Sequence, residues 1–279
     1  LLRDGQARGE VATDLDTAHA AIDECFDGRF GDAGAMVLVE EFLDGPECSL
    51  LAFVDGATVL PMAPAQDHKR VGEGDTGPNT GGMGVYSPVP LVQEADYAAM
   101  VAMMQATADA LVAEKIEYRG VLYGGFILTE SGPKLLEFNA RFGDPETQVV
   151  LPRLNTDLAE VLLACATGRL TEVELDWSSD VAVSVVIASG GYPGSYPTGK
   201  PITGIAEADA IDGVTVYHAG TRIDDGSLVT AGGRVLNVTA VGPDFATAID
   251  TAYQAVDLID FDGAFSRRDI GRRALDPSA

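Results

Sequence analysis

The most constraining feature of this sequence is a short stretch, residues 134–141, that reads KLLEFNAR. Side chains along a β-strand point alternately to its two faces, so Glu137, Asn139 and Arg141 are expected to share one face. The opposite face would take Leu136, Phe138 and Ala140. A carboxylate and an amide two residues apart offer hard oxygen ligands for Mg²⁺, and a nearby arginine can neutralise a phosphoryl group. Taken alone, the triplet fits equally well a half-buried strand that shows polar groups to water.

The residues after this strand favour the functional interpretation. Residues 141–147, RFGDPET, place Asp144, Glu146 and a glycine directly after the strand end, where ligand-binding loops of α/β proteins gather. A simple surface turn requires no such combination. The full stretch 137–148, EFNARFGDPETQ, resembles the metal and phosphate motif of the ATP-grasp superfamily, in the form carried by phosphoribosylamine-glycine ligases.

A second stretch carries the same resemblance. Residues 66–88, QDHKRVGEGDTGPNTGGMGVYSP, are similar to the long central loop of that family almost residue by residue. Within this stretch Lys69 and Arg70 can meet anionic groups, and closely spaced glycines permit a close backbone approach. Residues 63–90 are rich in Gly, Pro, Asp and Asn and show little apolar periodicity, so they predict a long loop that touches ligand.

The sequence does not fit other classes of phosphate-binding glycine motif. Residues 72–77 match G-x-G-x-x-G, but no predicted strand precedes them and Pro78 follows in place of a helix. The Walker pattern G-x-x-x-x-G-K-[ST] does not occur. We therefore predict neither a dinucleotide-binding fingerprint nor a P-loop.

Residues 37–49, VLVEEFLDGPECS, predict a strand and resemble the hinge at which ATP-grasp proteins hold adenine and ribose. By that resemblance Glu40, backbone groups around Leu43, and Glu47 would contact the nucleotide. A carboxylate suits the ribose hydroxyls, and main-chain groups suit the adenine edge. Without the resemblance, Glu40 and Glu41 are strand-end acids of an acidic protein.

The C-terminal part resembles the family as well. The matching stretches are ASGGYPGSYPTGKPI (188–202), YHAGT (217–221), TAGGRVLNVTA (230–240) and RRDIG (267–271). A dense basic cluster is formed by Arg267, Arg268, Arg272 and Arg273. We expect this cluster to dock the C-terminal tail onto the acidic body of the protein rather than to bind phosphate.

The resemblance implies a reaction and a set of residue roles. In this family the carboxylate of glycine attacks the γ-phosphate of ATP, and the amine of 5-phosphoribosylamine captures the acyl phosphate, which gives glycinamide ribonucleotide, ADP and phosphate. Glu137 and Asn139 would hold Mg²⁺ or Mn²⁺, and Arg141 would stabilise the phosphoryl and acyl-phosphate charge. The other implied roles are assistance to nearby anions by Lys69 and Arg70, and a pocket for glycine and ribose phosphate shaped by Asp75, Asn79, Gly82 and Asp144.

The expected fold is α/β (α+β), an ATP-grasp core with a partial lid followed by a small mixed C-terminal domain. Residues 1–170 would form the ATP-grasp domain, with a lid remnant at 1–38 and a core at 39–170, and residues 180–279 the C-terminal ligase domain. Helices are expected at 17–26, 97–112, 157–166 and 245–256. Strands are expected at 36–42, 49–54, 58–62, 121–129, 134–138, 181–189, 214–220, 227–231 and 235–241.

Two features depart from the family pattern. Family members begin with a Rossmann-like domain and a lid that contains a lysine and a glycine-rich loop, but residues 1–15 carry no such motif, so we expect an N-terminally truncated chain. The predicted strand 121–129 offers no acidic residue where the wider superfamily commonly has another metal ligand. Coordination of two metals therefore stays open.

The charge composition argues against some partners. The chain has 43 acidic and 18 basic residues, a net charge of -25, and four lysines among the basic residues. Such a field repels polyanions, so we expect no nucleic-acid and no anionic-membrane partner. The acids are spread along the chain rather than gathered in one tail, which favours a halophilic source over an ordinary acidic cytosolic protein.

Cysteine usage and hydropathy indicate a cytoplasmic protein. Cys25, Cys48 and Cys165 are odd in number and far apart in the sequence, which argues against a disulfide framework and a zinc site. The longest apolar stretches, such as 181–189, fall well short of the roughly 20 residues that span a bilayer.

Three functional interpretations remain open. The first is a ligase of purine biosynthesis, the second is another ATP-grasp carboxylate-amine ligase, and the third is a non-catalytic nucleotide-binding fragment. The central loop and the C-terminal part favour the first over the second, because general ATP-grasp similarity would be confined to the hinge and the E-x-N strand. The sequence predicts no particular oligomeric state.

Overall fold

The computed structural model describes residue 12, residues 14–27 and residues 36–276 of the chain. The chain divides into two compact units, Leu1–Asp44 and Gly45–Ala279. The first unit contains helix α1 (Leu15–Phe26), which starts two residues before the predicted position. Asp14 caps this helix, since its side chain accepts a hydrogen bond from the Thr17 backbone N–H at 2.8 Å.

The strand predicted at 36–42 is wrong. These residues have irregular backbone, and their apolar side chains are largely exposed, with Met36 86% and Phe42 66% accessible. A strand forms only where a neighbouring backbone takes its hydrogen bonds, and the described residues of the first unit include no strand. Most of the predicted lid remnant, 1–38, lies outside the described residues.

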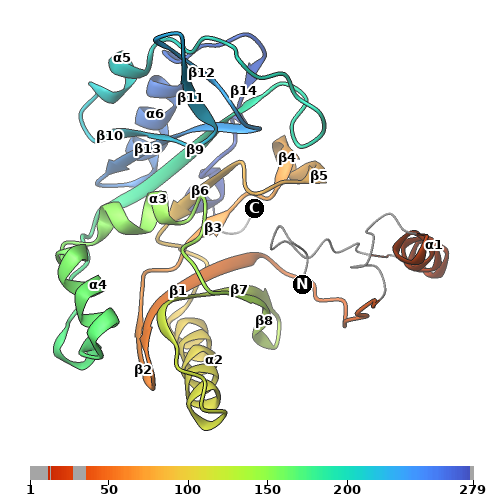
Figure 1. The fold of residues 1–279 in the computed structure, drawn as a ribbon, viewed down its shortest axis with the longest axis vertical. Coiled ribbons are helices and arrows are strands. Elements are labelled where there is room, and N and C mark those ends of the chain that lie inside the picture. Colours follow the sequence, from red (N-terminus) through yellow and green to blue (C-terminus); the bar gives the residue numbers. More distant parts are fainter. Residues whose placement is uncertain (1–11, 13, 28–35, 277–279) are drawn as a thin grey trace. The chain divides into compact units, whose positions relative to one another are not determined.

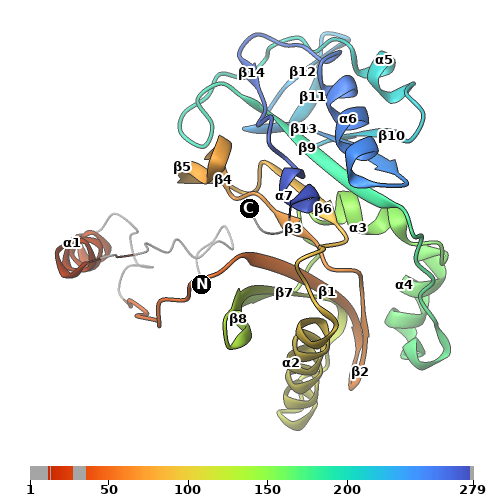
Figure 2. The same cartoon turned by 180° about the vertical axis from the view of Figure 1, so that it is seen from behind.

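The second unit contains a four-stranded antiparallel sheet in the order β2-β1-β7-β8. Its strands are β1 (Glu47–Asp55), β2 (Thr58–Pro61), β7 (Arg119–Thr129) and β8 (Gly132–Asn139). Both predicted hairpins are confirmed, because β1 pairs with β2 and β7 with β8. Figures 1 and 2 show helix α2 (Glu94–Ala113) against one face of this sheet.

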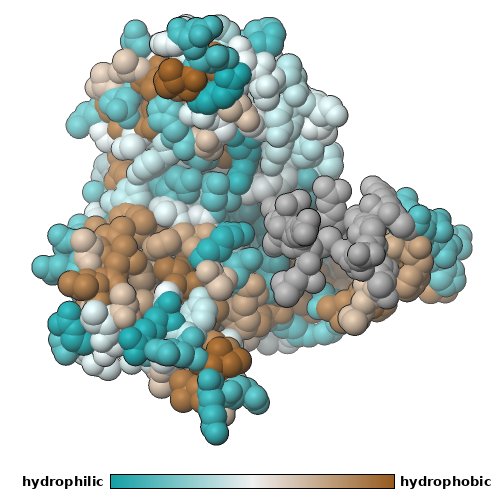
Figure 3. Space-filling view, viewed as in Figure 1, coloured by the Kyte–Doolittle hydropathy of each residue, from teal (hydrophilic) through white to brown (hydrophobic). Residues whose placement is uncertain are grey.

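Alternation along β1 places apolar side chains on both faces of the sheet. Leu50 and Ala52 join the buried cluster that contains Met100 of α2, whereas Leu51 joins a second cluster on the other face. That second cluster includes side chains of α4 (Leu158–Thr167), a helix that Asp157 caps at its start and Gly168 at its end, within one residue of the predicted range 157–166. Leu162 and Leu163 of α4 are exposed, and Figure 3 shows apolar surface on the side of the molecule where this helix lies.

The alternation predicted for residues 134–141 is interrupted by a bulge. Gly125 of β7 pairs with Glu137 while the next residue, Phe126, pairs with Leu135, so Leu136 is an extra residue in β8. Leu136 is 40% exposed, and Leu135 packs against the core in its place. The prediction that Leu136 takes the apolar face is therefore wrong.

A second antiparallel sheet follows the order β10-β13-β9-β6-β3, with β14 also paired to β9. Its strands are β3 (Gln66–Asp67), β6 (Gly84–Ser87), β9 (Val181–Ser189), β10 (Val214–His218), β13 (Arg234–Gly242) and β14 (Ala264–Phe265). Helix α6 (Phe245–Val256) packs on β9 and β13. The smaller elements are hairpins β4 (Arg70–Gly72) with β5 (Thr76–Asn79) and β11 (Thr221–Asp224) with β12 (Ser227–Thr230), and helices α3 (Thr147–Val150), α5 (Ile205–Asp209) and α7 (Arg272–Leu275).

The long loop predicted at 63–90 contains four short strands. β4 and β5 pair with each other, β3 pairs with β6, and β6 pairs with β9 of the C-terminal part. Of these strands, β6 pairs with a strand about 100 residues further along the chain, which no local sequence pattern indicates. One sheet thus crosses the predicted domain boundary near 170–180, and that boundary stays a prediction. In the described part of the chain, no helix is long and apolar enough to cross a membrane.

Candidate functional site

The polar ends of β1, β7 and β8 meet on the sheet face opposite α2. Ser49 of β1 pairs with Gly125 of β7, which pairs with Glu137 of β8, and Tyr123 pairs with Asn139 in the neighbouring row. Side chains of paired residues project from the same face of a sheet. The Asn139 amide nitrogen donates to Glu137 Oε1 at 3.4 Å, so the predicted pair does lie together.

This pair has the chemistry of a partial site for a hard cation. Glu137 is exposed and Asn139 is half-buried at the end of β8. Within the described residues, no group of three or more His, Cys, Asp and Glu is placed to hold a metal. A Mg²⁺ ion at this place would fit the pair only if waters or ligand oxygens completed its shell, as is usual for Mg²⁺ beside phosphates. Arg141 follows in the exposed turn, with its Nη1 donating to the Phe142 carbonyl at 2.8 Å.

A buried carboxylate to which the sequence analysis assigned no role anchors the loop after β8. Glu146 is 4% exposed, and its Oε1 accepts from Ser49 Oγ at 3.0 Å and from Tyr123 OH at 3.1 Å. Burial, followed by the charge of Glu146, raises the pKa of Tyr123 and keeps its hydroxyl protonated. A side chain at Gly143 would collide with the Glu146 carboxylate, so this close approach requires glycine.

A cluster of charged side chains lies at the start of β1 and the end of β3. The Lys69 ammonium pairs with the Glu47 carboxylate, and Asp67 is buried beside them. Burial raises the pKa of Asp67 to about 7 against the opposing charge of Lys69, and Glu146 and Glu47 add to the rise. Burial alone would lower the pKa of Lys69, but the neighbouring carboxylates outweigh burial and raise it. Lys69 therefore stays cationic among three acids.

The β4–β5 hairpin holds three further predicted residues. Arg70 Nη1 donates to the Gly77 carbonyl at 2.8 Å, and Asn79 is exposed opposite Arg70 on β5. Asp75 instead faces the C-terminal tail, where its carboxylate pairs with Arg273 and, at 2.9 Å, with Arg267. The docking predicted for the basic cluster is confirmed at these two arginines.

Asp144 and the residue before Gly82 meet at one arginine. Arg234 of β13 donates to Asp144 Oδ2 at 3.0 Å, to the Asp144 carbonyl at 2.9 Å and to the Gly81 carbonyl at 2.7 Å. Gly82 has a φ of +111°, and a Cβ there would lie 2.6 Å from Pro145 Cδ. The central loop and the loop after β8 thus touch at Gly82. The predicted nucleotide contacts Glu40 and Leu43 belong to the first unit, where Glu40 is exposed and Leu43 half-buried.

Comparison with known families assigns the class. Residues 4–147 match the model described as Phosphoribosylglycinamide synthetase, ATP-grasp (A) domain, and residues 182–273 match the C domain of the same synthetase. Together with the antiparallel core sheet and the Glu137–Asn139 pair at its edge, these matches define an ATP-grasp protein.

Relatives narrow the class to one family. The chain is 53% identical over 278 residues to phosphoribosylamine-glycine ligase of a Synechocystis species and 50% identical over 277 residues to that of a Nostoc species, covering 98% and 97% of this chain. A solved structure of phosphoribosylamine-glycine ligase from Thermotoga maritima matches with a TM-score of 0.80 at 32% identity, over 92% of this chain and 64% of that one. The chain belongs to the phosphoribosylglycinamide synthetase family. It spans 65% of the length of the two curated relatives.

Proposed function

We propose that this chain serves the ATP-dependent ligation of glycine to 5-phosphoribosylamine through a glycyl phosphate, which yields glycinamide ribonucleotide, ADP and phosphate in purine biosynthesis. Relatives about half identical along nearly the whole chain bear the name of this reaction. The structural observation that carries the proposal is the Glu137–Asn139 pair at the edge of the core sheet, beside the loop that holds Asp144 and Glu146. We further propose the cytoplasm as the place of this reaction.

Glu137 and Asn139 would hold Mg²⁺ or Mn²⁺ in this proposal. The bound ion would neutralise the charge of the ATP phosphates. Arg141, exposed directly after the strand, would stabilise the phosphoryl and acyl-phosphate oxygens by charge-assisted hydrogen bonds. Catalysis would depend on positioning and electrostatics, as in other phosphoryl transfers, rather than on a covalent intermediate with the protein.

The remaining residues would bind the substrates. Glu40, Leu43 and Glu47 are proposed for the nucleotide, and the ion pair of Glu47 with Lys69 would orient both side chains. Lys69 and Arg70 would meet anionic groups. Asp75, Asn79, Gly82 and Asp144 would shape the pocket for glycine and ribose phosphate. Residues 1–170 and 180–279 are proposed as the ATP-grasp and C-terminal domains.

The test is ADP release from MgATP in molar KCl, with and without glycine and freshly made phosphoribosylamine. Release that requires both substrates is expected. Release that needs neither, or that needs a different carboxylate, would contradict the proposal and favour another ATP-grasp ligase. Binding of MgATP without any turnover would favour the nucleotide-binding fragment.

The metal assignment is tested by Glu137→Gln. We expect turnover to fall by on the order of 100-fold or more, because an oxygen ligand of the ion loses its charge. The melting temperature should stay within about 2 °C, since Glu137 is exposed. Glu130→Gln, at the opposite end of the same hairpin, is the matched control and should retain full turnover. Near-normal rates for Glu137→Gln would rule out the proposed metal ligand.

A further inference from the structure

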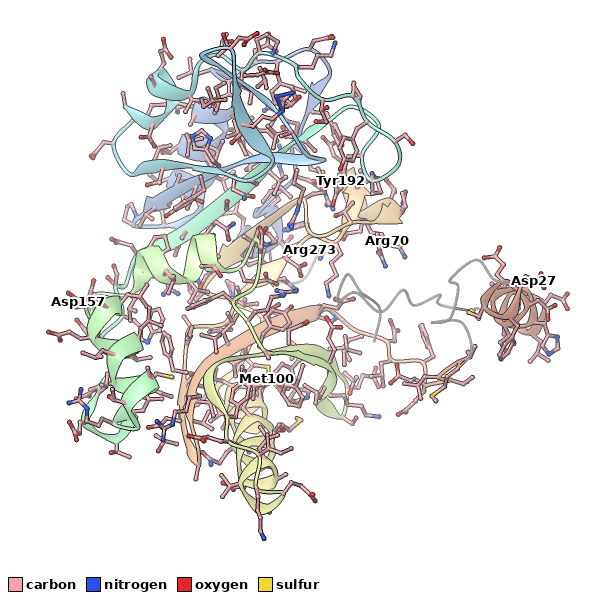
Figure 4. The ribbon with its side chains drawn as sticks, in the orientation of Figure 1. Asp27, Arg70, Met100, Asp157, Tyr192 and Arg273 are labelled. Atoms are coloured by element: carbon pink, nitrogen blue, oxygen red, sulfur yellow. The ribbon has the colours of Figure 1, made fainter. Side chains whose placement is uncertain are left out.

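Both backbone polar groups of Gly81 are held by the C-terminal part of the chain. The Gly81 N–H donates to Tyr192 OH at 3.0 Å, and the Gly81 carbonyl accepts from Arg234 Nη1 at 2.7 Å. These partners lie 111 and 153 residues further along the sequence. Figure 4 labels Tyr192 and, on the β4–β5 hairpin, Arg70. A single residue of the central loop is thus fixed by two side chains that come from distant segments.

Glycines on both sides make this contact possible. A Cβ at Gly81 would lie 3.0 Å from Arg234 Cζ, closer than ordinary carbon contacts. A side chain at Gly233 would collide with the Tyr192 ring, which lies against that backbone. The stretch TAGGRV (230–235) therefore contains the Gly233 backbone, against which the Tyr192 ring lies, and Arg234 in the next position. Glycine at these two positions is therefore needed for the close approach of Tyr192 and Arg234 to the backbone, and a simple turn would not require it.

The same guanidinium reaches a second loop. Besides Gly81 it contacts the Asp144 carbonyl at 2.9 Å and the Asp144 carboxylate at 3.0 Å, and its side chain is 19% exposed. The planar fork of arginine suits such simultaneous contacts, whereas the single ammonium of lysine does not. Arg234 thereby sets the distance between the central loop and the loop after β8.

The segment around Gly81 is also connected to Lys69. Thr80, the residue before Gly81, donates through its N–H and its hydroxyl to the Lys69 carbonyl at 2.7 and 2.8 Å. The Thr80 hydroxyl in turn accepts from the Gly82 N–H at 2.9 Å. Displacement of Gly81 would therefore disturb Gly82 on one side and the backbone of Lys69 on the other.

We infer that Tyr192 and Arg234 are positioning residues that clamp the Thr80–Gly82 segment and Asp144 into the substrate pocket. Neither side chain needs to touch the reacting atoms. The inference deepens the proposed function and rests on it for the identity of the substrates, glycine and phosphoribosylamine. Asp144 in this arrangement acts mainly as the partner of Arg234, and its contribution to the pocket comes through the backbone that it fixes.

Hydrogen exchange tests the clamp without any assay of activity. In Tyr192→Phe the Gly81 amide loses its acceptor, so exchange of the 80–83 segment should become about fivefold faster, the effect of one lost hydrogen bond. Arg234→Gln should accelerate the same segment and residues 143–146, and Arg234→Lys should fall between Arg234→Gln and the unaltered chain. The matched controls are Tyr196→Phe, on the neighbouring ring 6.2 Å away, and Arg222→Gln, an exposed arginine of β11. Unchanged exchange in both clamp variants would overturn the inference.

Kinetics test the role in the pocket. We expect Tyr192→Phe and Arg234→Gln to raise the KM for glycine or phosphoribosylamine about tenfold while the KM for ATP stays constant. A merely structural role would change the KM values for glycine, phosphoribosylamine and ATP together, or none of them. Either result would overturn the assignment of Tyr192 and Arg234 as positioning residues. Tyr192→Phe removes a single oxygen atom. We therefore expect this variant to fold even if Arg234→Gln does not. If the unaltered chain turns over without either substrate, the proposed function fails, and the exchange experiment still decides the clamp.

Discussion

Two glutamates nine positions apart show how the environment sets the role of a single residue. Glu137 is exposed at the strand edge, whereas Glu146 is buried and accepts hydrogen bonds from Ser49 and Tyr123. Sequence alone placed both within one motif and could not separate them. A buried carboxylate that has its donors orders its loop, and an exposed one remains available for a ligand. The difference became visible only when the partner strands were known.

Asp67 gives a prediction about pH at the same scale. Burial raises its pKa to about 7, while in the unfolded chain the carboxyl titrates near 4. Between these values the folded protein keeps a proton that the unfolded chain has lost, so stability falls as the pH rises from about 4 to about 7. Asp67→Asn should remove this decline, which amounts to a few kcal/mol at most.

The measurement is the urea midpoint at pH 4.5 and at pH 8, in molar KCl. Asp212→Asn is the control, because Asp212 is exposed and should leave the pH dependence as it is. An Asp67→Asn chain that loses as much stability between the two pH values as the unaltered chain would refute the assignment.

Helices and strands could be predicted from local sequence where the apolar pattern and, for a helix, the capping residue indicate the same element. The helix expected at 245–256 is α6, which Asp244 caps, and the strand expected at 181–189 is β9 residue by residue. Prediction failed where a distant partner decides the structure. β6 has four residues and pairs with the distant β9, and the bulge at Leu136 depends on the register with β7. The contacts of Tyr192 and Arg234 with Gly81 were not predicted for the same reason, since no local sequence pattern indicates them.

Adjacent glycines of β7 give a prediction for this element. A Cβ at Gly124 would lie 2.6 Å from the Phe126 ring and 3.0 Å from Met104 Sδ, so Gly124→Ala should cost about 1–3 kcal/mol through overpacking against α2. A Cβ at Gly125 would lie 3.4 Å from Glu137 Cγ, an ordinary contact, so Gly125→Ala should change stability by less than about 1 kcal/mol. Chemical denaturation of the two variants side by side makes the comparison, and equal losses would contradict the assigned faces of the strand.

At the scale of the whole molecule, charge is the dominant property. The net charge is -25, and Arg267, Arg268 and Arg273 of the C-terminal tail lie in ion pairs. Arg267 is 2% exposed and pairs with Asp75 and Asp269, and Arg268 pairs with Asp257. Acidic residues still outnumber basic ones by 25 in the whole chain. Dissolved salt screens repulsion between charges of the same sign.

We predict that the chain loses structure when salt is removed. At about 1 M salt the Debye length is about 3 Å, and at 0.01 M it is about 30 Å, so repulsion among the acids extends across the molecule only in dilute buffer. The melting temperature, followed by circular dichroism, should fall steeply between about 1 M and 0.05 M KCl. Sucrose at matched osmolality is the control and should not replace the salt. A melting curve independent of KCl would contradict the halophilic interpretation.

The pairing of β6 with β9 has a consequence for the order in which the chain acquires its structure. Gly84 lies opposite Val185, so the two partners are separated by about 100 residues of sequence. A ribosome that adds about 5–20 residues per second would expose the open edge of β6 for about 5–20 s before β9 emerges. During that interval the nascent chain offers unpaired backbone to other molecules, which makes it a candidate for chaperone protection. If the gene were divided near residue 175, the product of its first part would lack β9, and this edge of β6 would stay unpaired.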